Sequence, residues 1–515
     1  MTTEADVGWV RPKAVTHQGE AAGYATLTHP TEWVAIEQVA EINPRIDKSA
    51  IPDDLAVSFV PMPAVGEENG HICVDATRLA GEVKKGYTAF LEGDVLFAKI
   101  TPCMENGKMA VAPKLVNGYG FGSTEFHVLR PKAWIDAKYL YFYVSSKKFR
   151  SEAERHMTGA VGQRRVPTAY LKECLIPVVP LDHQKRIVAE IEKQFSRLDE
   201  AIANLKRVKA NLKRYKAAVL KAAVEGRLVE TEAERARRAA QGSANVAGGR
   251  MPGATEGRSL ETGEQLLQRI LETRRSQWSG RGKYKEPAAP DTTNLPELPE
   301  GWVWASAEQI SDFITKGTTP VATKLSDGSG EIQFLKVYNL TFEGLLNDTY
   351  KPAFVSRDTH EGELSRSKVR AGDVLINIVG PPLGQVSVVP PKIVEANINQ
   401  AIARFRPIPP LGSDYLSVAF LSESVMTWAT RKAKTTAGQS NLTLELCRAI
   451  PIPLPPEAEQ HRIVAEVDRR LTLLREAEAQ VDANLQRAEH LRQSILSRAF
   501  SGDLPPAQTL SEVAA

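Results

Sequence analysis

The residues of this chain whose types and spacing could do chemistry are two acidic residues and a lysine near its beginning. Asp53 follows a proline, and Glu82 and Lys84 stand in the sequence Glu-Val-Lys. Two carboxylates and a lysine can together hold Mg²⁺ and activate a water molecule, which is the chemistry of a nuclease. Because such a scatter of three residues arises often by chance, a stand-alone Mg²⁺-dependent nuclease is one alternative among others.

Other motifs with a chemical mechanism are missing from the sequence. The glycine-rich stretch Gly118–Gly122 lacks the spacing of a dinucleotide site, and no Walker-type phosphate loop is present. The histidines form no H-E-x-x-H motif, and no Pro-Pro pair belongs to the Asn/Asp-Pro-Pro-aromatic tetrapeptide expected of an amino-methyltransferase. The four cysteines contain no C-x-x-C pair. No catalytic constellation therefore stands out, and the cysteines suggest neither a disulfide framework nor a zinc site.

Length and composition are those of a globular protein with two to four domains. The 515 residues are 42% apolar and 25% charged, and the formal net charge of +3 is compatible with nucleic-acid binding without proving it. The N-terminal residues are polar, and no apolar run approaches the roughly 20 residues that a membrane span requires. A cytoplasmic protein without a membrane segment is the simplest interpretation.

The elements that would position any functional residue occur twice. The sequence IVAEIEKQF at 187–195 is repeated as IVAEVDRRL at 463–471, an offset of 276 residues. The same order continues upstream, where EGDVLFAKI at 92–100 matches AGDVLINIV at 371–379. A repeat of this period is far too long for a solenoid. The chain therefore consists of two copies of a globular unit followed by a long helix.

Each globular unit is predicted to be mixed and rich in strands, because short apolar runs alternate with glycine, proline and asparagine. Ala, Gly and Arg dominate residues 229–260, where large apolar residues are almost absent, which is typical of a flexible linker. The predicted order is a disordered tail at 1–28, a first domain at 29–181, a long helix at 182–228, a linker at 229–300 with a short helix at 264–278, a second domain at 301–456, a second long helix at 457–503, and a tail at 504–515.

Apolar residues repeat every seven positions along both long helices, which predicts that the helices form a coiled coil. The alternative is that each helix packs on its own globular domain. The coiled coil is favoured because a helix of more than 40 residues is about 65 Å long and extends beyond a single globular domain. Pairing with each other would bury the apolar positions of both helices. The predicted interface is Ile191, Leu198, Leu205, Leu212, Val219, Val467, Leu474, Val481, Leu491 and Ile495.

The two long helices differ in charge. Residues 182–227 carry a net charge of +6, from twelve basic and six acidic side chains, whereas residues 457–502 carry a net charge of −1, from seven basic and eight acidic side chains. The opposite net charges of the two helices could simply help them pair with each other. Alternatively, a basic group on the first helix faces an acidic partner or a phosphate backbone: Lys206, Arg207, Lys209, Lys213, Arg214 and Lys216.

These features together resemble the specificity subunits of Type I restriction–modification systems. The resemblance covers roughly residues 30–505 and rests on the duplication, on the order of its parts and on local motifs. Residues 57–112, beginning VSFVPMPAV, resemble a recurrent first recognition domain of the family. The sequence EQLLQRILETRRSQW at 264–278 resembles its short central helix, and LPEGWVWASAEQI at 298–310 resembles the opening of a second recognition domain.

The resemblance implies an α+β fold with two mixed α/β target recognition domains in pseudo-twofold arrangement, separated by a long antiparallel two-helix coiled coil. In the family, each domain reads one half of a bipartite site in double-stranded DNA, and the helices set the spacer. Two modification (methyltransferase) subunits dock beside the helices, and restriction subunits are expected to join them. S-adenosylmethionine, ATP and Mg²⁺ belong to these partner subunits. This chain itself is implied to be non-catalytic.

Polar residues at matched positions of the two copies are the candidate DNA contacts. Arg, Asn and Gln can read base edges with paired hydrogen bonds, and Lys more often contacts phosphate. Stabilisation of a loop by the same side chain is at least as good an explanation for any one of them. The candidates are Lys99, Thr101, Asn106, Lys108, Ser123, Thr124, Gln163, Arg164 and Arg165 in the first copy, and Asn377, Gln385, Asn397, Asn399, Gln400, Gln439, Ser440 and Asn441 in the second.

Two other functions compete with DNA recognition. A structural adaptor would use the coiled coil without touching DNA, and a stand-alone nuclease would use Asp53, Glu82 and Lys84. The second globular copy has no counterpart to this nuclease pattern, because SRSKVRAGD at 365–373 has no acidic residue two positions before a lysine. Cleavage of DNA by the isolated chain with Mg²⁺ would favour the nuclease.

Overall fold

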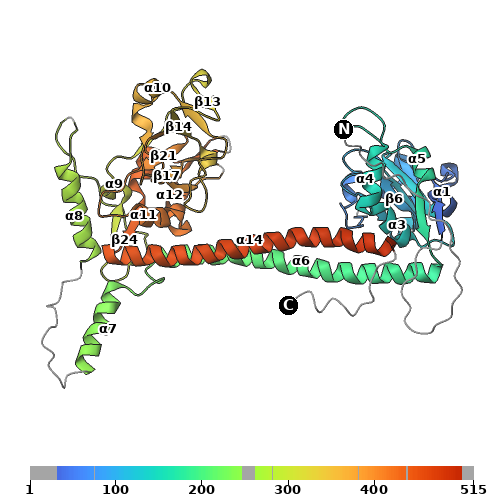
Figure 1. The fold of residues 1–515 in the computed structure, drawn as a ribbon, viewed down its shortest axis with the longest axis horizontal. Helices are drawn as coiled ribbons and strands as arrows, with labels where there is room; N and C mark the ends of the chain where they lie inside the picture. Colours follow the sequence, from blue (N-terminus) through green and yellow to red (C-terminus); the bar gives the residue numbers. More distant parts are fainter. Residues whose placement is uncertain are drawn as a thin grey trace, which may run out of the picture. The chain divides into compact units, whose positions relative to one another are not determined.

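The computed structural model describes residues 32–74, 76–245, 261–280, 282–380, 382–436 and 439–501. Within these ranges the chain forms two compact units, divided between Leu205 and Lys206 and again between Asp482 and Ala483 (Figure 1). Each unit has its own buried apolar clusters. The predicted tails at 1–28 and 504–515, and residues 246–260 of the predicted linker, lie outside the described residues.

The first unit contains two four-stranded sheets, ordered β2-β9-β6-β7 and β4-β3-β8-β5, and the two-stranded sheet β1-β10. The strands are β1 (Glu32–Ala35), β2 (Ala40–Ile42), β3 (Ala56–Val60), β4 (Thr77–Leu79), β5 (Thr88–Leu91), β6 (Val95–Ala98), β7 (Met109–Val111), β8 (Tyr119–Gly122), β9 (Phe126–Pro131) and β10 (Leu175–Val178). The helices are α1 (Ile36–Val39), α2 (Ala80–Val83), α3 (Ala137–Ser145), α4 (Lys147–Arg155) and α5 (Thr168–Glu173), with short 3-10 turns η1 (Lys48–Ala50), η2 (Met62–Ala64) and η3 (Val116–Gly118).

The second unit has sheets ordered β12-β21-β17-β19, β13-β15-β14-β20-β16, β18-β23-β22 and β11-β24. The strands are β11 (Val303–Ser306), β12 (Thr315–Lys316), β13 (Ser326–Asp327), β14 (Ile332–Leu335), β15 (Ala353–Val355), β16 (Lys368–Val369), β17 (Val374–Asn377), β18 (Val379–Gly380), β19 (Val386–Val388), β20 (Ala396–Ile398), β21 (Ile402–Phe405), β22 (Lys434–Thr436), β23 (Gln439–Asn441) and β24 (Pro451–Leu454). The helices are α7 (Glu232–Asn245), α8 (Gly263–Ser276), α9 (Ala307–Ile310), α10 (Arg357–Glu361), α11 (Ser413–Leu421), α12 (Glu423–Lys432) and α13 (Leu444–Ala449), with η4 (Ala322–Lys324), η5 (Val337–Asn339) and η6 (Ser365–Ser367).

The central strand of each unit is buried on both faces. Side chains alternate between the two faces of a strand. In β6, Val95 and Phe97 belong to one apolar cluster, and Leu96 belongs to another. In β17, Val374 and Leu375 divide between two clusters in the same way. This explains why the GDVL stretches read as continuous apolar runs.

Matched hydrogen bonds show the duplication in three dimensions. Both copies have one parallel strand pair, β3 with β8 and β14 with β20, among mostly antiparallel ones. The hydroxyl of Tyr139 donates to the carbonyl of Pro177 at 2.9 Å, and Tyr415 donates to Pro453 at 2.6 Å. The predicted repeat of mixed α/β units is therefore confirmed.

An ion pair anchors the same strand pair in both copies. Asp94 is buried and accepts two hydrogen bonds of 2.8 Å from Arg130 and one of 2.7 Å from the backbone of Leu91. Asp373 is buried and pairs with Arg406 at 2.6 and 2.8 Å. The bond to each aspartate raises the pKa of its arginine. The aspartate and the arginine of each ion pair belong to the Gly-Asp and Arg-Pro dipeptides that both copies share.

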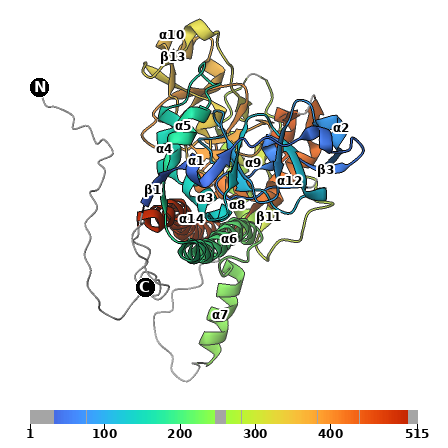
Figure 2. The same ribbon diagram turned by 90° about the vertical axis from the view of Figure 1, so that its right-hand side faces the viewer.

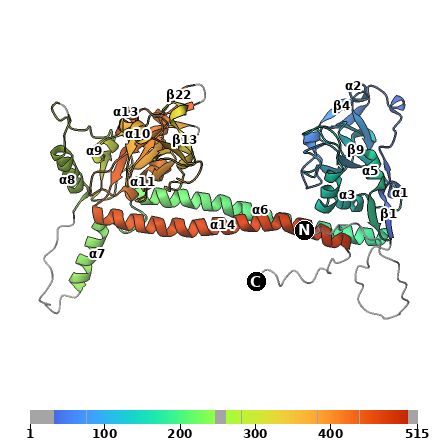
Figure 3. The same cartoon turned by 45° about the horizontal axis from the view of Figure 1, so that its top comes forward.

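Two long unbroken helices, α6 (Leu181–Val224) and α14 (Glu457–Ser501), each contribute to both units. In the first unit, Arg492 forms an ion pair with Asp199 and lies 4.4 Å from the ring centroid of Phe195. In the second unit, Lys209 pairs with Asp482 at 2.5 Å. In the same unit, Arg470 of α14 lies 3.4 Å from the hydroxyl of Tyr215 of α6, so within this unit the two helices run antiparallel side by side (Figures 1 and 3).

The residues predicted for the interface between the helices differ in burial. Leu205 and Leu212 are half-buried. Seven of the predicted residues are buried: Ile191, Leu198, Val219, Val467, Leu474, Val481 and Ile495. Leu491 is 46% exposed and does not belong to the seam. The second row of α14 lies four residues after the first row, where Leu471 and Ala499 are buried and Arg492 contacts α6.

The predicted linker contains a helix that the sequence did not reveal. Helix α7 is anchored by its first turn, where Thr231 and Glu232 are buried, and it projects from the rest of its unit (Figures 1 and 2). Its sequence is rich in Ala and Arg and has no apolar period, so it resembles a linker in composition. The short central helix is present as α8, capped by Thr262 and Gln265. None of the helices in the described ranges combines the length and apolarity of a membrane span.

Candidate nucleic-acid interface

Backbone hydrogen bonds bring three predicted segments of the first unit together. The amide of Lys99 donates to the carbonyl of Glu125 at 2.9 Å, and the amide of Val166 donates to the carbonyl of Lys99 at 2.8 Å. The amide of Thr101 donates to the carbonyl of Arg164 at 3.0 Å. The end of β6, the turn before β9 and the loop after α4 therefore meet. We call these segments, 99–101, 123–125 and 163–166, the first loop junction.

The second unit repeats this junction at matched positions. The amide of Ile378 donates to the carbonyl of Ala401 at 2.9 Å, and the amide of Leu442 donates to the carbonyl of Ile378 at 2.9 Å. Ile378 thus takes the place of Lys99, and Leu442 that of Val166. The second loop junction consists of segments 377–379, 399–401 and 439–442. The same backbone holds different side chains in the two copies.

An arginine–glutamate pair lies in the first loop junction. Arg165 donates two hydrogen bonds to the carboxylate of Glu125, at 2.9 and 2.7 Å. The hydrogen bond from Arg165 lowers the pKa of Glu125, so the pair stays charged. Side-chain exposure of 43% leaves Arg165 accessible from outside. Its neighbour Arg164 lies 3.7 Å from Glu154 and is also partly exposed.

The remaining candidates of the first unit divide into exposed and bonded residues. Thr124, Gln163 and Asn106 are exposed, and Asn106 donates to Glu67 at 3.2 Å. Lys108 is half-buried and donates to the carbonyl of Val65. Among these residues, the exposed ones are the best placed for a ligand. Two further candidates are occupied by local contacts, Thr101 donating to Glu105 and Ser123 accepting from the amide of Glu125.

Two residues that sequence reasoning missed support the first loop junction and its neighbouring turn from the interior. Arg150 on α4 is buried, donates to the carbonyl of Ser145 at 3.0 Å, and also contacts the carbonyl of Glu105. His127 is buried, which lowers its pKa, and its Nε2 lies 2.8 Å from the carbonyl of Val166. Because that carbonyl only accepts, the proton is on Nε2. Both residues lie far in sequence from the loops that they hold, and no local pattern marks them.

Asn377 is not available for DNA contact, which corrects its prediction as a candidate. It is 1% exposed, and its Nδ2 donates to the carbonyl of Pro382 at 2.6 Å. Its Oδ1 accepts from the amide of Val379 at 3.0 Å. Gln385 is half-buried and donates to the carbonyl of Leu340 at 3.0 Å. Both side chains shape the turn after β17.

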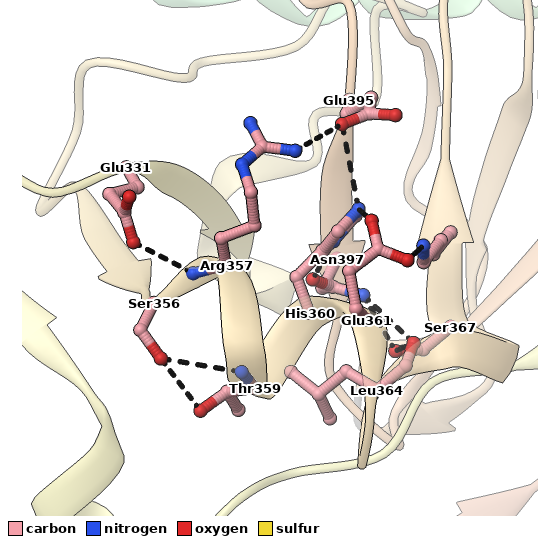
Figure 4. Close-up of polar contacts among 11 residues, drawn as sticks. Glu331, Ser356, Arg357, Thr359, His360, Glu361, Leu364, Ser367, Glu395 and Asn397 are labelled. Carbon is pink, nitrogen blue, oxygen red and sulfur yellow. Dashed lines mark hydrogen bonds and ion pairs between the residues drawn. The ribbon is translucent and has the colours of Figure 1, made fainter.

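Asn397 is likewise internal and is withdrawn from the candidates. Its Nδ2 donates to the carbonyl of Leu364 at 3.0 Å and to the hydroxyl of Ser367 at 3.1 Å (Figure 4). Its Oδ1 lies 2.7 Å from Nδ1 of His360, and both residues are fully buried. These bonds join β20 to α10 and η6, so Asn397 stabilises the domain.

The second loop junction keeps four candidates whose side chains are described. Gln400 is exposed, and Asn399, Ser440 and Asn441 are half-buried. The Oδ1 atom of Asn399 has no hydrogen-bond partner among the described residues. In β23, Ser440 and Asn441 pair with Gly380 and Val379 of β18. Gln439 lies in the same strand, and its side chain is outside the described part of the chain.

The residues of the nuclease alternative have a structural role. Lys84 pairs with Asp53 at 2.7 Å and also contacts the carbonyl of Ile51. The hydrogen bond that Lys84 donates to Asp53 lowers the pKa of Asp53. Glu82 is exposed on α2. Within the described ranges, no group of three or more His, Cys, Asp or Glu side chains could hold a metal ion.

Comparison with known proteins gives consistent matches. Residues 30–214 match the model of the Type I restriction modification DNA specificity domain. The specificity subunit of the Type I restriction enzyme EcoEI from Escherichia coli is 27% identical, and that of EcoAI from the same species is 26% identical. Each of these matches covers 91% of this chain and 82% of the relative.

Solved structures share the fold. A chain from a structure concerning complex assembly and conformational transition of the type I R-M system has a TM-score of 0.66 and 19% identity. The HsdS subunit from Thermoanaerobacter tengcongensis has a TM-score of 0.52 and 21% identity. Both matches cover 92% of this chain and 98% of the solved chain. Residues 30–214 thus match a Type I restriction modification DNA specificity domain, and the chain is similar over 91% of its length to specificity subunits of Type I restriction enzymes.

Proposed function

We propose that this chain is the DNA sequence-recognition subunit of a Type I restriction–modification complex. Each unit reads one half of a bipartite, asymmetric site in double-stranded DNA. The antiparallel pair α6 and α14 connects the two readers and sets the length of DNA between the half-sites. Chemistry on the DNA is carried out by partner subunits, so this chain contributes recognition and no catalysis.

The single observation that carries this proposal is the repeated loop junction. Lys99 and Ile378 make the same two backbone hydrogen bonds in the two units, yet the side chains around them differ. The first junction presents Gln163, Arg164 and Arg165, and the second presents Asn399 and Gln400. Arg reads guanine, and Asn or Gln reads adenine, by bidentate hydrogen bonds. One scaffold with two different sets of readers fits a site whose halves differ.

The partners follow from the same proposal. Two modification subunits supply S-adenosylmethionine and adenine-N6 methylation, and restriction subunits supply ATP-driven cleavage with Mg²⁺. None of these cofactors is proposed to bind this chain. We further propose the domain boundaries 29–181 and 301–456 for the two recognition domains and a cytoplasmic location for the complex.

The proposal is tested by expressing the chain with a modification subunit and sequencing the methylated adenines of the host genome. We expect one bipartite motif with a spacer of fixed length. A variant with Gln163→Ala and Arg164→Ala relaxes one half of that motif and leaves the other half intact. Methylation without any sequence preference would refute the proposal. The structural-adaptor alternative predicts that the chain has no effect on where the DNA is methylated.

A further inference from the structure

A six-residue motif occurs twice in the middle of α6, with a spacing of seven residues. The sequence Asn-Leu-Lys-Arg-x-Lys occurs at 204–209 and again at 211–216. Seven residues are nearly two helical turns, so each residue of the first copy has an equivalent about 10.5 Å further along the same face. Between Glu200 and Glu225 the helix contains no acidic residue. We call Lys206, Lys209, Lys213 and Lys216 the basic stripe.

Only half of the basic stripe is neutralised within the second unit. Lys209 pairs with Asp482 at 2.5 Å, and Lys216 lies 3.8 Å from Glu343. Lys206 and Lys213 are exposed, and neither has an ion-pair partner among the residues that the structure describes. Arg214 is exposed too, and its guanidinium lies 3.5 Å from the amide oxygen of Asn211. The helix therefore presents a row of positive charge to its surroundings.

Of the four lysines, Lys209 alone stabilises the helix pair through an ion pair within the described ranges, with Asp482 of α14. The four lysines follow one another at spacings of three, four and three residues, where side chains on one helix are neighbours. Like charges at these spacings destabilise a helix. The half-buried residues Leu205 and Leu212 stand directly before Lys206 and Lys213 in the sequence. A binding partner of opposite charge accounts for the stripe.

We propose that the basic stripe binds the phosphate backbone of the DNA between the two half-sites, an inference that rests on the proposed function. Lysine and arginine both bind phosphate, lysine as a compact point charge and arginine through its planar guanidinium. Equivalent lysines about 10.5 Å apart match about three base-pair steps along one DNA strand. DNA in this region needs no base reading, because contacts to phosphate are independent of sequence.

The test compares the double variant Lys206→Gln/Lys213→Gln with the wild-type chain, each assembled with the modification subunit. The DNA is a duplex carrying the motif found by methylome sequencing. Each phosphate contact that is lost makes the slope of log affinity against log salt shallower by about 0.9, so we expect a change of about 1.8. The methylated motif itself stays the same. Neutral methylphosphonates in the spacer weaken wild-type binding and leave the variant nearly unaffected.

A matched control removes two positive charges from α6 outside the basic stripe. Lys193 and Lys221 are exposed and lie 3.9 and 3.8 Å from Glu190 and Glu225. Lys193→Gln/Lys221→Gln is expected to retain the wild-type salt slope. The inference is overturned if the stripe variant keeps the wild-type slope. It is also overturned if that variant loses affinity for the modification subunit with its slope unchanged, which would identify an acidic protein surface as the partner. A wild-type complex without sequence preference would instead refute the proposed function.

Discussion

At the residue scale, side-chain type alone could not separate a DNA reader from a structural residue. An asparagine that caps a turn and one that reads adenine use the same amide group. Asn377 and Asn397 were predicted as readers, and the structure shows both buried in hydrogen bonds to backbone and side chains. Arg164 and Gln163 were predicted in the same way and lie at the surface of a loop junction. Whether a polar side chain is buried depends on the tertiary fold and cannot be predicted from its neighbours in the sequence.

Replacing Asn397 with alanine is expected to lower the free energy of unfolding by about 1–3 kcal/mol or more, because buried partners would lose their hydrogen bonds. The partners are the carbonyl of Leu364, the hydroxyl of Ser367 and the ring of His360. Denaturant unfolding followed by circular dichroism measures the change. Gln400→Ala is the matched control, because Gln400 is exposed in the same segment. Equal stability of the two variants would contradict the structural role of Asn397.

Replacing Arg164 with alanine is expected to weaken recognition of one half-site by about 1–3 kcal/mol, as the loss of a base-reading arginine does. The variant should fold normally, since Arg164 is partly exposed and its ion-pair distance to Glu154 is 3.7 Å. Competition binding with single-base variants of the motif locates the relaxed position. A uniform loss over all sequences would instead assign Arg164 to phosphate contact.

At the element scale, the periodicity of the sequence predicted both long helices and one row of their seam. It also predicted Leu491, which is exposed, because α14 offers an apolar residue either three or four positions after the first row. Leu491 lies in the predicted row, and Leu471 lies in the observed one. The true row also contains Arg492, which packs its guanidinium on Phe195 instead of presenting an apolar side chain. An analysis of apolar periodicity alone cannot predict that a basic residue lies between two helices.

Leu474→Ala is expected to lower the free energy of unfolding by about 2–5 kcal/mol, the usual range for a buried leucine. Leu474 is 6% exposed within the core of the second unit. Leu491→Ala is the control on the same helix and should change stability by less than about 0.5 kcal/mol, because Leu491 is 46% exposed. Thermal unfolding of both variants gives the comparison. A large loss for Leu491→Ala would restore the original row.

The N-terminal turn of α14 holds a buried carboxyl group that should make stability depend on pH. Glu459 accepts from the indole of Trp302 and from the amide of Glu232, both at 3.1 Å. Burial raises the pKa of Glu459 above its ordinary value, although both hydrogen bonds oppose this shift. A carboxyl with a raised folded pKa binds its proton more tightly in the folded state. Its stabilising effect is complete below the unfolded pKa and is lost as pH rises through the folded pKa.

Glu459→Gln is therefore expected to remove part of the decline in stability over the pH range from the ordinary glutamate pKa of 4.5 up to the raised folded pKa. The amide can still accept from Trp302 and cannot ionise. The difference in melting temperature between the variant and the wild type, measured across this range, should grow in favour of the variant as pH rises. A difference that is constant with pH would show that Glu459 does not titrate in this window.

At the scale of the whole molecule, the duplication was the most informative feature of the sequence. An offset of 276 residues predicted two globular units, each followed by a long helix, and the matched bonds of Tyr139 and Tyr415 confirm the repeat. The alignment of 92–100 with 371–379 places Lys99 opposite Ile378, but only the structure shows that the two residues make the same backbone hydrogen bonds. Backbone hydrogen bonds preserve a scaffold while its side chains change. This is how one fold can read two different half-sites.

The central claim is that two independent readers are held at a spacing that the helix pair determines. Its most direct test is methylome sequencing of a variant that lacks residues 199–205 of α6 and residues 486–492 of α14, which are opposite each other in the antiparallel pair. Removing seven residues from both helices keeps the seam in register and shortens them by about 10.5 Å. We predict that both half-sites keep their sequences and that the spacer becomes about three base pairs shorter. An unchanged spacer, or altered half-site sequences, would contradict the account.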